Sequence, residues 1–163
     1  MEIRFGSADD LNILAAAEAQ CFNRAERADT ETIRERLNAY PNHFLLLHEG
    51  GELAAYIDGA ATKERDLSDA MFEDVSMHDE NGGWQMIFGL GVLPKFRGRG
   101  YAAALINSFA ELAERERRLG VVLTCKPRLV PFYTKFGFID EGVCPSVHGG
   151  AVWHQMRLEF KKR

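Results

Sequence analysis

The chain has 163 residues, of which 46% are hydrophobic and 27% are charged, and its formal net charge is −4 at pH 7. This length suits one domain with a core to bury, and the acidic balance argues against a nucleic-acid-binding surface, which is usually basic. The sequence has no apolar run that could span a bilayer and no signal-peptide layout at its N-terminus. We therefore expect a cytoplasmic protein of one domain, residues 1–163, without nucleic-acid or membrane partners.

The first part of the chain predicts one strand, two helices and a hairpin. Ser7 and the residues after it offer N-cap chemistry for the first helix, and Asp29 or Thr30 caps the second, which ends before Pro41. The glycine pair 50–51 is a two-residue hairpin signal. The expected elements are a strand over residues 2–5, a helix ending near Cys21, a polar loop over 22–28, the second helix, and strands over 44–49 and 52–60.

The second part predicts strands that alternate with helices. Residues 62–83 are the least regular, and residues 84–92 form a mostly apolar run typical of a buried strand. Gly89 and Gly91 lie inside that run, which indicates a bulge or the close approach of a backbone or ligand. The further expected elements are a helix over 101–119 stopped by Gly120, a strand over 121–125, a short helix over 131–136, and strands over 138–141 and 151–160. This order predicts a mixed α/β sheet.

A turn between the buried strand and the long helix has the chemistry of an anion site. Gly98 and Gly100 allow tight turning, so that backbone N–H groups face one point, and the helix adds its positive N-terminal end. Arg97 and Arg99 add charge, and Ala102 is small. Neither the Rossmann pattern nor the P-loop pattern matches here. The segment therefore predicts a pyrophosphate site, with a plain turn carrying two solvated arginines as the alternative.

The pattern Arg97-x-x-Gly100-x-Ala102 resembles the Q/R-x-x-G-x-G/A motif of the GNAT acetyltransferases. The resemblance implies the GNAT fold, a mixed central sheet flanked by helices, with splayed central strands that hold the pantetheine arm of acetyl-CoA. It implies that the backbones of Leu90 and Val92 contact the pantetheine and the acetyl carbonyl. It also implies that the pyrophosphate is held by the amides of Arg97, Gly98, Arg99, Gly100, Tyr101, Ala102 and Ala103.

A second motif, LVPFYTKFGF at residues 129–138, resembles the arylalkylamine N-acetyltransferase branch of that family. The likeness continues through Gly142-x-Cys144, Gly149, Trp153 and Met156. It implies that Tyr133 is the catalytic acid, and we expect Phe132 beside it to contact the cofactor. A phenol can protonate the departing CoA thiolate, because its ordinary pKa, near 10, lies close to that of a thiol. The alternative is that Tyr133 only packs in the core with Phe132 and Phe136.

The chain departs from the animal enzymes of that branch at the proton relay. Their two histidines fall on Met86 and Phe88 here, and neither side chain accepts a proton. Candidate bases in the irregular stretch are Glu73, Asp74, His78, Asp79 and Glu80, with His148, His154 and ordered water as further candidates. Aromatic residues that could line an acceptor pocket, or could simply pack in the core, are Phe22, Phe72, Trp84 and Phe88.

Together these features predict direct acetyl transfer from acetyl-CoA to a primary amine of a small molecule, with an arylalkylamine as one acceptor class. Polyamines, aminoglycosides and peptide amines stay open as acceptors, and so does a CoA-binding sensor without turnover. We expect no metal, because the three cysteines and five histidines show no ligand spacing. Cys125 is expected to be a buried structural residue. The oligomeric state, including a homodimer, stays open.

Overall fold

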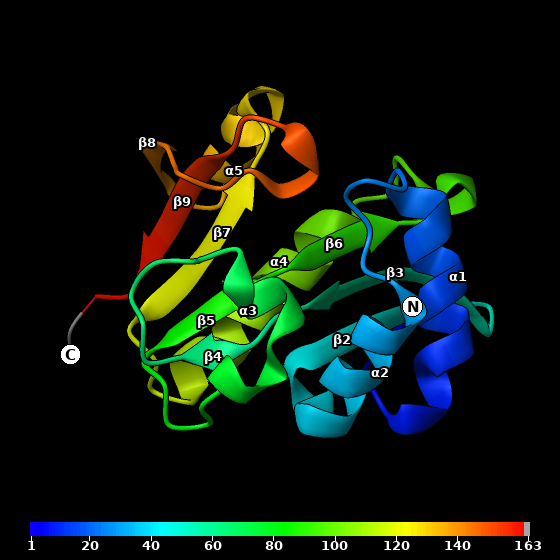
Figure 1. The fold of residues 1–163 in the computed structure, drawn as a ribbon. Helices are drawn as coiled ribbons and strands as arrows, with labels where there is room; N and C mark the ends of the chain where they lie inside the picture. The colour runs from blue at the N-terminus through cyan, green and yellow to red at the C-terminus, as the bar shows by residue number, and fades with distance from the viewer. Residues whose placement is uncertain (162–163) are drawn as a thin grey trace.

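The computed structural model describes residues 1–161, and its strands form two sheets that diverge from one central stretch of chain (Figure 1). The first sheet has the order β1-β2-β3-β6 and the second has the order β4-β5-β7-β9-β8. Neighbouring strands are antiparallel, except that β5 and β7 are parallel. The strands are β1 Glu2–Phe5, β2 Phe44–Glu49, β3 Glu52–Asp58, β4 Ala61–Thr62, β5 Trp84–Ile87, β6 Gly89–Val92, β7 Gly120–Cys125, β8 Ile139–Val143 and β9 His154–Glu159.

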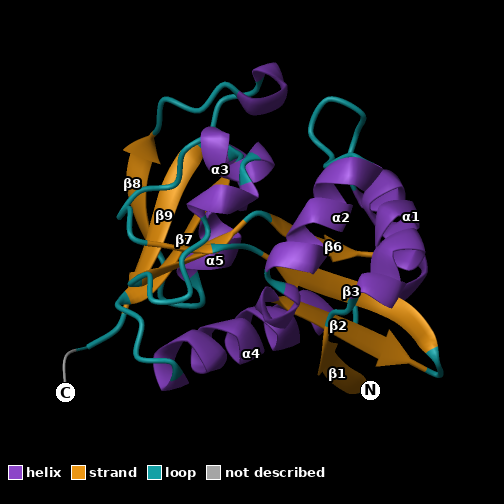
Figure 2. Cartoon of the chain, turned by 60° about the horizontal axis from the view of Figure 1, so that its bottom comes forward, coloured by secondary structure: helices purple, strands orange, loops and turns teal. Residues whose placement is uncertain are grey.

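Helices cover both faces of the first sheet (Figure 2). The α-helices are α1 Leu11–Cys21, α2 Thr30–Ala39, α3 Ala70–Glu73, α4 Tyr101–Arg115 and α5 Val130–Thr134, and the 3₁₀ turns are η1 Ala8–Asp10, η2 Pro41–His43, η3 Val75–Met77, η4 Pro94–Phe96, η5 Pro127–Leu129 and η6 His148–Gly150. Side chains alternate along β2, as in any strand, so Leu45 and Leu47 pack in the core beneath α4 while Phe44 and Leu46 pack with α1 and α2. None of the described helices is long and apolar enough to cross a membrane.

The sequence predicts one strand over the apolar run 84–92, but the structure has two strands there. The chain breaks at Phe88, whose N–H donates to Asp58 O at 2.8 Å, and β6 then stays with β3 while β5 joins β7. A Cβ on Gly89 would lie 2.8 Å from Asp58 Oδ1, and one on Gly91 would lie 2.8 Å from the Tyr56 ring. The glycines therefore make room for side chains of β3, rather than for another backbone.

The long helix is shorter than its sequence predicts, and Gly120 does not end it. Helix α4 ends at Arg115, and Arg117 then takes the left-handed conformation with φ 63°. Arg118 N donates to Ala113 O at 3.1 Å and Arg117 N donates to Glu114 O at 2.9 Å, the two bonds of a Schellman cap. Gly120 instead begins β7, where a Cβ would lie 2.3 Å from Leu158 O. The close approach of β9 explains this glycine.

The remaining expected elements are present with shifted bounds. The first two helices and the hairpin lie where the sequence predicts them, and Asp29 caps α2 by accepting from Thr32 N at 2.8 Å. The irregular stretch 62–83 contains α3 and η3, which its sequence does not reveal. The last strand begins at His154 rather than at residue 151, because residues 148–150 form a 3₁₀ turn.

Candidate active site

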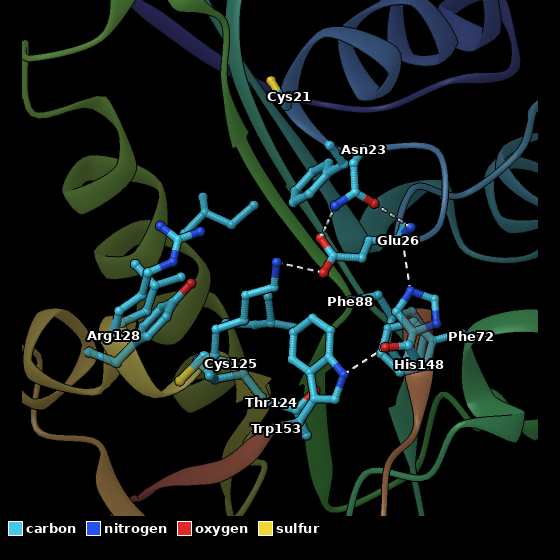
Figure 3. Close-up of a pocket in the computed structure, with 17 residues that line it drawn as sticks. Cys21, Asn23, Glu26, Phe72, Phe88, Thr124, Cys125, Arg128, His148 and Trp153 are labelled. Carbon is cyan, nitrogen blue, oxygen red and sulfur yellow. Dashed lines mark hydrogen bonds and ion pairs between the residues drawn. The ribbon is translucent and has the colours of Figure 1, made fainter. Parts of the chain in front are cut away.

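The two sheets separate where β5 gives way to β6, and a cavity of about 370 Å³ occupies the resulting wedge (Figure 3). The pairing of β5 with β7 ends at Ile87 and Leu123, after which β6 pairs only with β3 while β7 runs on to Cys125. The predicted splaying of the central strands is therefore observed. The cavity is lined on one side by Leu90 and on the other by Leu123, Thr124 and Cys125, and Tyr133 also faces it.

The backbone of β6 offers unpaired groups to this wedge. Val92 lies opposite Ala55, yet it is Leu93 N that donates to Ala54 O at 2.9 Å, so Val92 belongs to a non-hydrogen-bonded pair. Its N–H and C=O therefore point away from β3, and so do those of Leu90, two residues earlier. Arg97 Nε donates to Val92 O at 3.1 Å. The backbone groups of Leu90 are the ones presented to the cavity.

The turn that follows β6 leads into the N-terminus of α4. Gly98 and Gly100 both take positive φ, 81° and 80°, and a Cβ on either would meet nothing within 4 Å. The first helical hydrogen bond runs from Ala104 N to Gly100 O at 3.1 Å, so Tyr101, Ala102 and Ala103 carry the N–H groups that a helix leaves without an internal acceptor. Such groups and the helix dipole together suit an anion.

The two arginines of this turn are held by neighbours rather than solvated freely. Arg97 bonds Val92 O as described, and Arg99 forms an ion pair with Glu49 at 2.5 Å between Nη1 and Oε2. The Arg99 guanidinium also lies 5.4 Å from the centre of the buried Phe96 ring. These contacts fix the shape of the turn on both sides of Gly98.

Tyr133 lies on α5, its ring is buried, and the residue lines the cavity. Its ring meets Phe132 and Phe138 edge to face, with centroids 5.1 and 6.0 Å apart. Burial, together with the charge that the Cys125 thiolate would carry, raises the pKa of Tyr133. The phenol therefore stays protonated and can act as a donor. Phe132 lies behind it, with its ring also against Phe136 at 5.2 Å.

Aromatic rings enclose the cavity on the side away from the turn. Phe72 lies 4.8 Å from Phe88 and stacks on His148 at 5.1 Å, and Trp153 lies 5.9 Å from His148. Phe22 is the fifth ring in the lining. Trp84 is not part of this wall, because it packs with Met71, Met86 and Val122 inside the second sheet. The expectation of an aromatic pocket thus holds for Phe22, Phe72 and Phe88 and is wrong for Trp84.

A partly buried ion pair joins two walls of the cavity, and the sequence gives no signal for it. Lys126 Nζ, just after β7, lies 2.6 Å from Glu26 Oε1 on the loop between α1 and α2. Asn23 Nδ2 donates to Glu26 Oε2 at 3.2 Å, and His148 Nε2 bonds Glu26 O at 2.8 Å (Figure 3). One hundred residues separate Glu26 from Lys126, so only the fold brings them together. The pair ties the 22–28 loop to the second sheet.

Only one of the candidate bases from the sequence reaches the wedge cavity. His148 lines it, and because its Nε2 must carry a proton to donate to Glu26 O, its Nδ1 is left as an acceptor in the neutral ring. Glu73 lies on a neighbouring cavity, and Asp74 caps η3 by accepting from Ser76 N at 3.0 Å. His154 pairs with Asp140 at 3.0 Å near the sheet edge. His78, Asp79 and Glu80 lie at the far end of β4 and β5, where they do not line the wedge.

Two histidines and a glutamate gather at that far end, although their sequence spacing does not predict it. His43, His78 and Glu80 place potential ligand atoms within 4.8 Å of one another. His78 Nδ1 accepts from Ala61 N at 3.1 Å, so its Nε2 carries the proton that it shares with Glu80 at 2.8 Å. That nitrogen has no lone pair for a metal.

Gln85 and Arg118 extend the same cluster into a network of hydrogen bonds and ion pairs. Gln85 Nε2 donates to the carbonyls of Gly59 and Met86, so its Oε1 accepts from His43 Nδ1 at 2.8 Å. His43 Nε2 faces Glu80 at 2.9 Å, and Arg118 Nη2 lies 3.3 Å from the same carboxylate. Both ring nitrogens of His43 therefore lie next to side-chain oxygens. We call this set, His43, His78, Glu80, Gln85 and Arg118, the His43–Glu80 network.

The model of the acetyltransferase (GNAT) family matches residues 11–138. The chain belongs to the GNAT family. Its fold agrees with solved GNAT-type structures: the loading GNATL domain of CurA from Lyngbya majuscula has a TM-score of 0.85 at 16% identity, covering 97% of this chain and 96% of that one. The structure of yncA from Salmonella typhimurium, solved with its cofactor acetyl-CoA, has a TM-score of 0.72 at 17% identity, covering 100% and 95%.

A curated GNAT relative agrees with the branch that the second motif resembles. Serotonin N-acetyltransferase of Mesocricetus auratus is 28% identical over 132 residues, which are 80% of this chain and 62% of that protein. The chain thus spans less than two thirds of that relative's length. In this GNAT chain the motif residues 97–103 lie where β6 meets α4, and Tyr133 on α5 lines the wedge cavity.

Proposed function

We propose that the chain is an acetyl-CoA-dependent N-acetyltransferase that acetylates the primary amine of a small molecule. The observation that carries the proposal is the order of three groups along the chain and the cavity. Leu90 and Tyr133 line the wedge cavity, and β6 leads on from Leu90 into the turn at Gly98 and Gly100, where the amides of Tyr101, Ala102 and Ala103 begin α4. An acyl thioester with a long arm and a pyrophosphate matches these groups in chemistry and in order.

Each residue of the site would have a separate role in direct transfer within a ternary complex. The N–H of Leu90 faces the wedge and would donate to the carbonyl oxygen as it gains charge, which is stabilisation of the oxyanion type. Tyr133, kept protonated by burial, would donate to the departing thiolate. Val92, the amides of residues 97–103 and Phe132 would position the cosubstrate. Cys125 is buried, with a pKa raised to about 11 by burial and by the nearby Asp140 and Cys144 charges, so it is unsuited to be a nucleophile.

The aromatic wall supports an arylalkylamine as the acceptor class. Phe22, Phe72, Phe88 and Trp153 offer faces to an aromatic ring or to an ammonium group, and Glu26 is the carboxylate among them. The likeness to serotonin N-acetyltransferase points the same way. Polyamines, aminoglycosides and peptide amines belong in the same screen as competing acceptors.

The test of catalysis is Tyr133→Phe in a thiol-release assay with acetyl-CoA and a panel of amines that includes tryptamine. We expect kcat to fall by about 100-fold or more, since a general acid contributes at least this much, while acetyl-CoA affinity is retained. Thr134→Val, which removes a hydroxyl from the next residue of α5, is the matched control and should keep activity. If wild type and Tyr133→Phe bind acetyl-CoA equally and neither releases thiol above background, a CoA-binding sensor replaces the enzyme. Met86 and Phe88, in place of histidines, are the features that favour this sensor.

The turn is tested by Gly100→Asp. The carboxylate would bring negative charge to the amides that face the pyrophosphate, so we expect acetyl-CoA affinity to fall by more than tenfold, about 1.4 kcal/mol. Gly50→Asp is the control, because Gly50 also has positive φ and open space around it but lies in the β2–β3 hairpin. Equal affinities of the two variants, measured by calorimetry, would refute the turn as the pyrophosphate site.

A further inference from the structure

A second ionic network lies directly behind the start of β6. It consists of Glu18 on α1, Arg36 on α2, and Tyr56 and Asp58 on β3, and all four are buried. We call it the Glu18–Asp58 network. None of these residues belongs to the sequence motifs, and the proposed transfer chemistry does not yet use them.

The contacts leave one carboxylate oxygen of this network open. Arg36 Nη1 donates to Asp58 Oδ2 at 3.1 Å, and Arg36 Nη2 donates to Phe72 O at 2.8 Å. Glu18 accepts from Tyr56 Oη and, at 2.7 Å, from Ala28 N. Asp58 Oδ1 accepts no hydrogen bond from any described side chain. The network therefore keeps a free acceptor.

The charges of the network do not balance. Two carboxylates face one guanidinium, which leaves one surplus negative charge in a buried place. Among the other titratable groups around it, Tyr40, Cys21 and Asp29 carry no positive charge, and Arg97 is bonded to Val92 O. Two further cations, Arg24 and Arg27, line the same cavity as Glu18. Uptake of one proton would make the network neutral.

The surplus charge lies beside the proposed reaction site. A Cβ on Gly89 would lie 2.8 Å from Asp58 Oδ1 and 3.8 Å from Glu18 Oε1, and Gly89 immediately precedes Leu90, whose backbone faces the wedge. Glu18 also lines a second cavity of about 480 Å³. That cavity shares Glu26, Phe72, Phe88 and His148 with the wedge cavity, so the two are neighbours.

We propose that the carboxylate pair Glu18–Asp58 takes the proton that the acceptor ammonium must lose before it attacks, which rests on the acetyltransferase function proposed above. One N–H proton passes from R–NH₃⁺ to the pair through water in the shared cavity, and the freed lone pair forms the new N–C bond. The C–S bond then breaks, the thiolate takes the Tyr133 proton, and the amide nitrogen returns its second proton to Tyr133. The pair releases its proton to solvent as the product leaves. The pair would thus take the role of the two histidines that Met86 and Phe88 replace in this chain.

The titration of Asp58 agrees with that geometry. Burial raises the pKa of Asp58 to about 6, against the lowering effect of Arg36 and with the support of the Glu18 charge. A base with a pKa near the working pH is deprotonated before the reaction and can still hold a proton during it. Below about pH 6 the pair is already protonated, so the rate should fall as pH falls through that value.

The experiment measures kcat/KM for tryptamine between pH 5 and 9 in wild type, Asp58→Asn and Glu18→Gln. We expect kcat/KM of each variant to be about 100-fold lower at pH 7.5. The acid limb of the profile, which is the fall of kcat/KM below about pH 6, should be lost, while acetyl-CoA affinity stays unchanged. Glu73→Gln is the matched control, because it removes an exposed carboxylate from the second cavity without touching the network. It should keep the wild-type pH profile.

Two further measurements keep the proposal falsifiable if those variants do not fold. Tyr56→Phe removes the hydroxyl that Glu18 accepts from but keeps both carboxylates, so we expect its acid limb to move to higher pH with the plateau at pH 8 retained. Carbon-13 NMR of the carboxyl groups in wild type should show Asp58 titrating near pH 6.

The outcomes separate this proposal from the one on which it rests. Turnover of tryptamine with unchanged pH profiles in Asp58→Asn and Glu18→Gln would overturn the role of the pair alone. A carboxyl at position 58 that titrates near the ordinary aspartate value of about 4 would do so as well. A wild type that acetylates no amine in the panel overturns both proposals.

Discussion

The two ionic networks differ in burial and in their balance of carboxylates and guanidinium groups. In the His43–Glu80 network one exposed carboxylate faces one guanidinium, and both ring nitrogens of His43 have partners. In the Glu18–Asp58 network two buried carboxylates accompany one guanidinium, and Asp58 Oδ1 accepts no hydrogen bond from any described side chain. The first lies at the far end of β5, and the second lies beside the wedge.

This difference separates a structural role from a chemical one. A buried charge without full compensation costs stability, so it persists where something else requires it. The His43–Glu80 network joins η2, β5 and the loop before β5, which explains its presence by itself. No structural link of this kind explains the Glu18–Asp58 network, but a chemical role beside Leu90 does.

The largest effect expected is that of Arg36→Met. It leaves two buried carboxylates without their guanidinium, and removing one partner of a buried ion pair costs about 3–5 kcal/mol. Urea denaturation at pH 7 measures the loss. Arg34→Met on the same helix is the control, because Arg34 is half-exposed and pairs only with Glu31, so the cost should stay below about 1 kcal/mol. Similar losses in the two variants would contradict the comparison.

The pH dependence of stability should have opposite signs in the two networks. The folded-state pKa of Asp58, about 6, lies above the unfolded value near 3.9, so its contribution is fully present below about pH 4 and is lost as pH rises through 6. About two units correspond to roughly 3 kcal/mol. The stability difference between wild type and Asp58→Asn should therefore shrink by about that amount from pH 4 to pH 8.

For Glu80 the sign is reversed. Burial acts to raise its pKa, but His43 and His78 outweigh burial, so the pKa in the folded state is lowered. Its contribution is present above the unfolded value and is lost as pH falls through the folded one. The stability difference between wild type and Glu80→Gln should grow with pH in the acid range, and curves that run parallel to those of Asp58→Asn would refute the distinction.

A smaller effect is expected from His43→Phe. The ring volume is roughly kept, but the buried Gln85 Oε1 loses its partner, which costs about 1–3 kcal/mol for an unsatisfied buried group. Because the network does not touch the wedge, the KM for acetyl-CoA and the pH profile of turnover should stay as in wild type. A shifted acid limb in this variant would mean that the two networks are coupled.

The smallest effect is expected from Tyr40→Phe. Tyr40 lies between the networks, with its ring 4.8 Å from that of His78, and its hydroxyl is buried without a hydrogen-bond partner among the described residues. Removal of an unsatisfied hydroxyl should change the free energy of unfolding by less than about 1 kcal/mol, in the stabilising direction. A larger loss in thermal or urea denaturation would show that this hydroxyl has a partner in solution.

Local patterns predict much of this fold. The first two helices with their N-caps and the Gly50-Gly51 hairpin are read from neighbouring residues, and these elements form as expected. The errors at Phe88 and Gly120 have a different origin. The break at Phe88 depends on the Asp58 and Tyr56 side chains of another strand, and Gly120 depends on the carbonyl of Leu158. No pattern within residues 84–120 contains these contacts.

The candidate site follows the same division. The turn and Tyr133 are found from motifs, because their chemistry is held within a few residues of chain. Glu26, Lys126, Glu18 and Asp58 come from four separate segments, and each is an ordinary charged residue in its own segment. What makes them notable is their mutual distance and, for Glu18 and Asp58, their burial, which only the tertiary structure supplies.

The position of β9 between β7 and β8 sets the order in which the wedge can be built. All the residues proposed to hold the cosubstrate precede residue 134, yet β7, one wall of the wedge, is paired along its outer edge by residues 154–159. The β2–β3 hairpin needs only nearby pairings, which form early, whereas the β7–β9 pairing waits for the end of the chain. A chain stopped at residue 153 would keep the motifs and lose the partner that holds β7 in place. The appearance of CoA binding during refolding would therefore report when β9 pairs with β7.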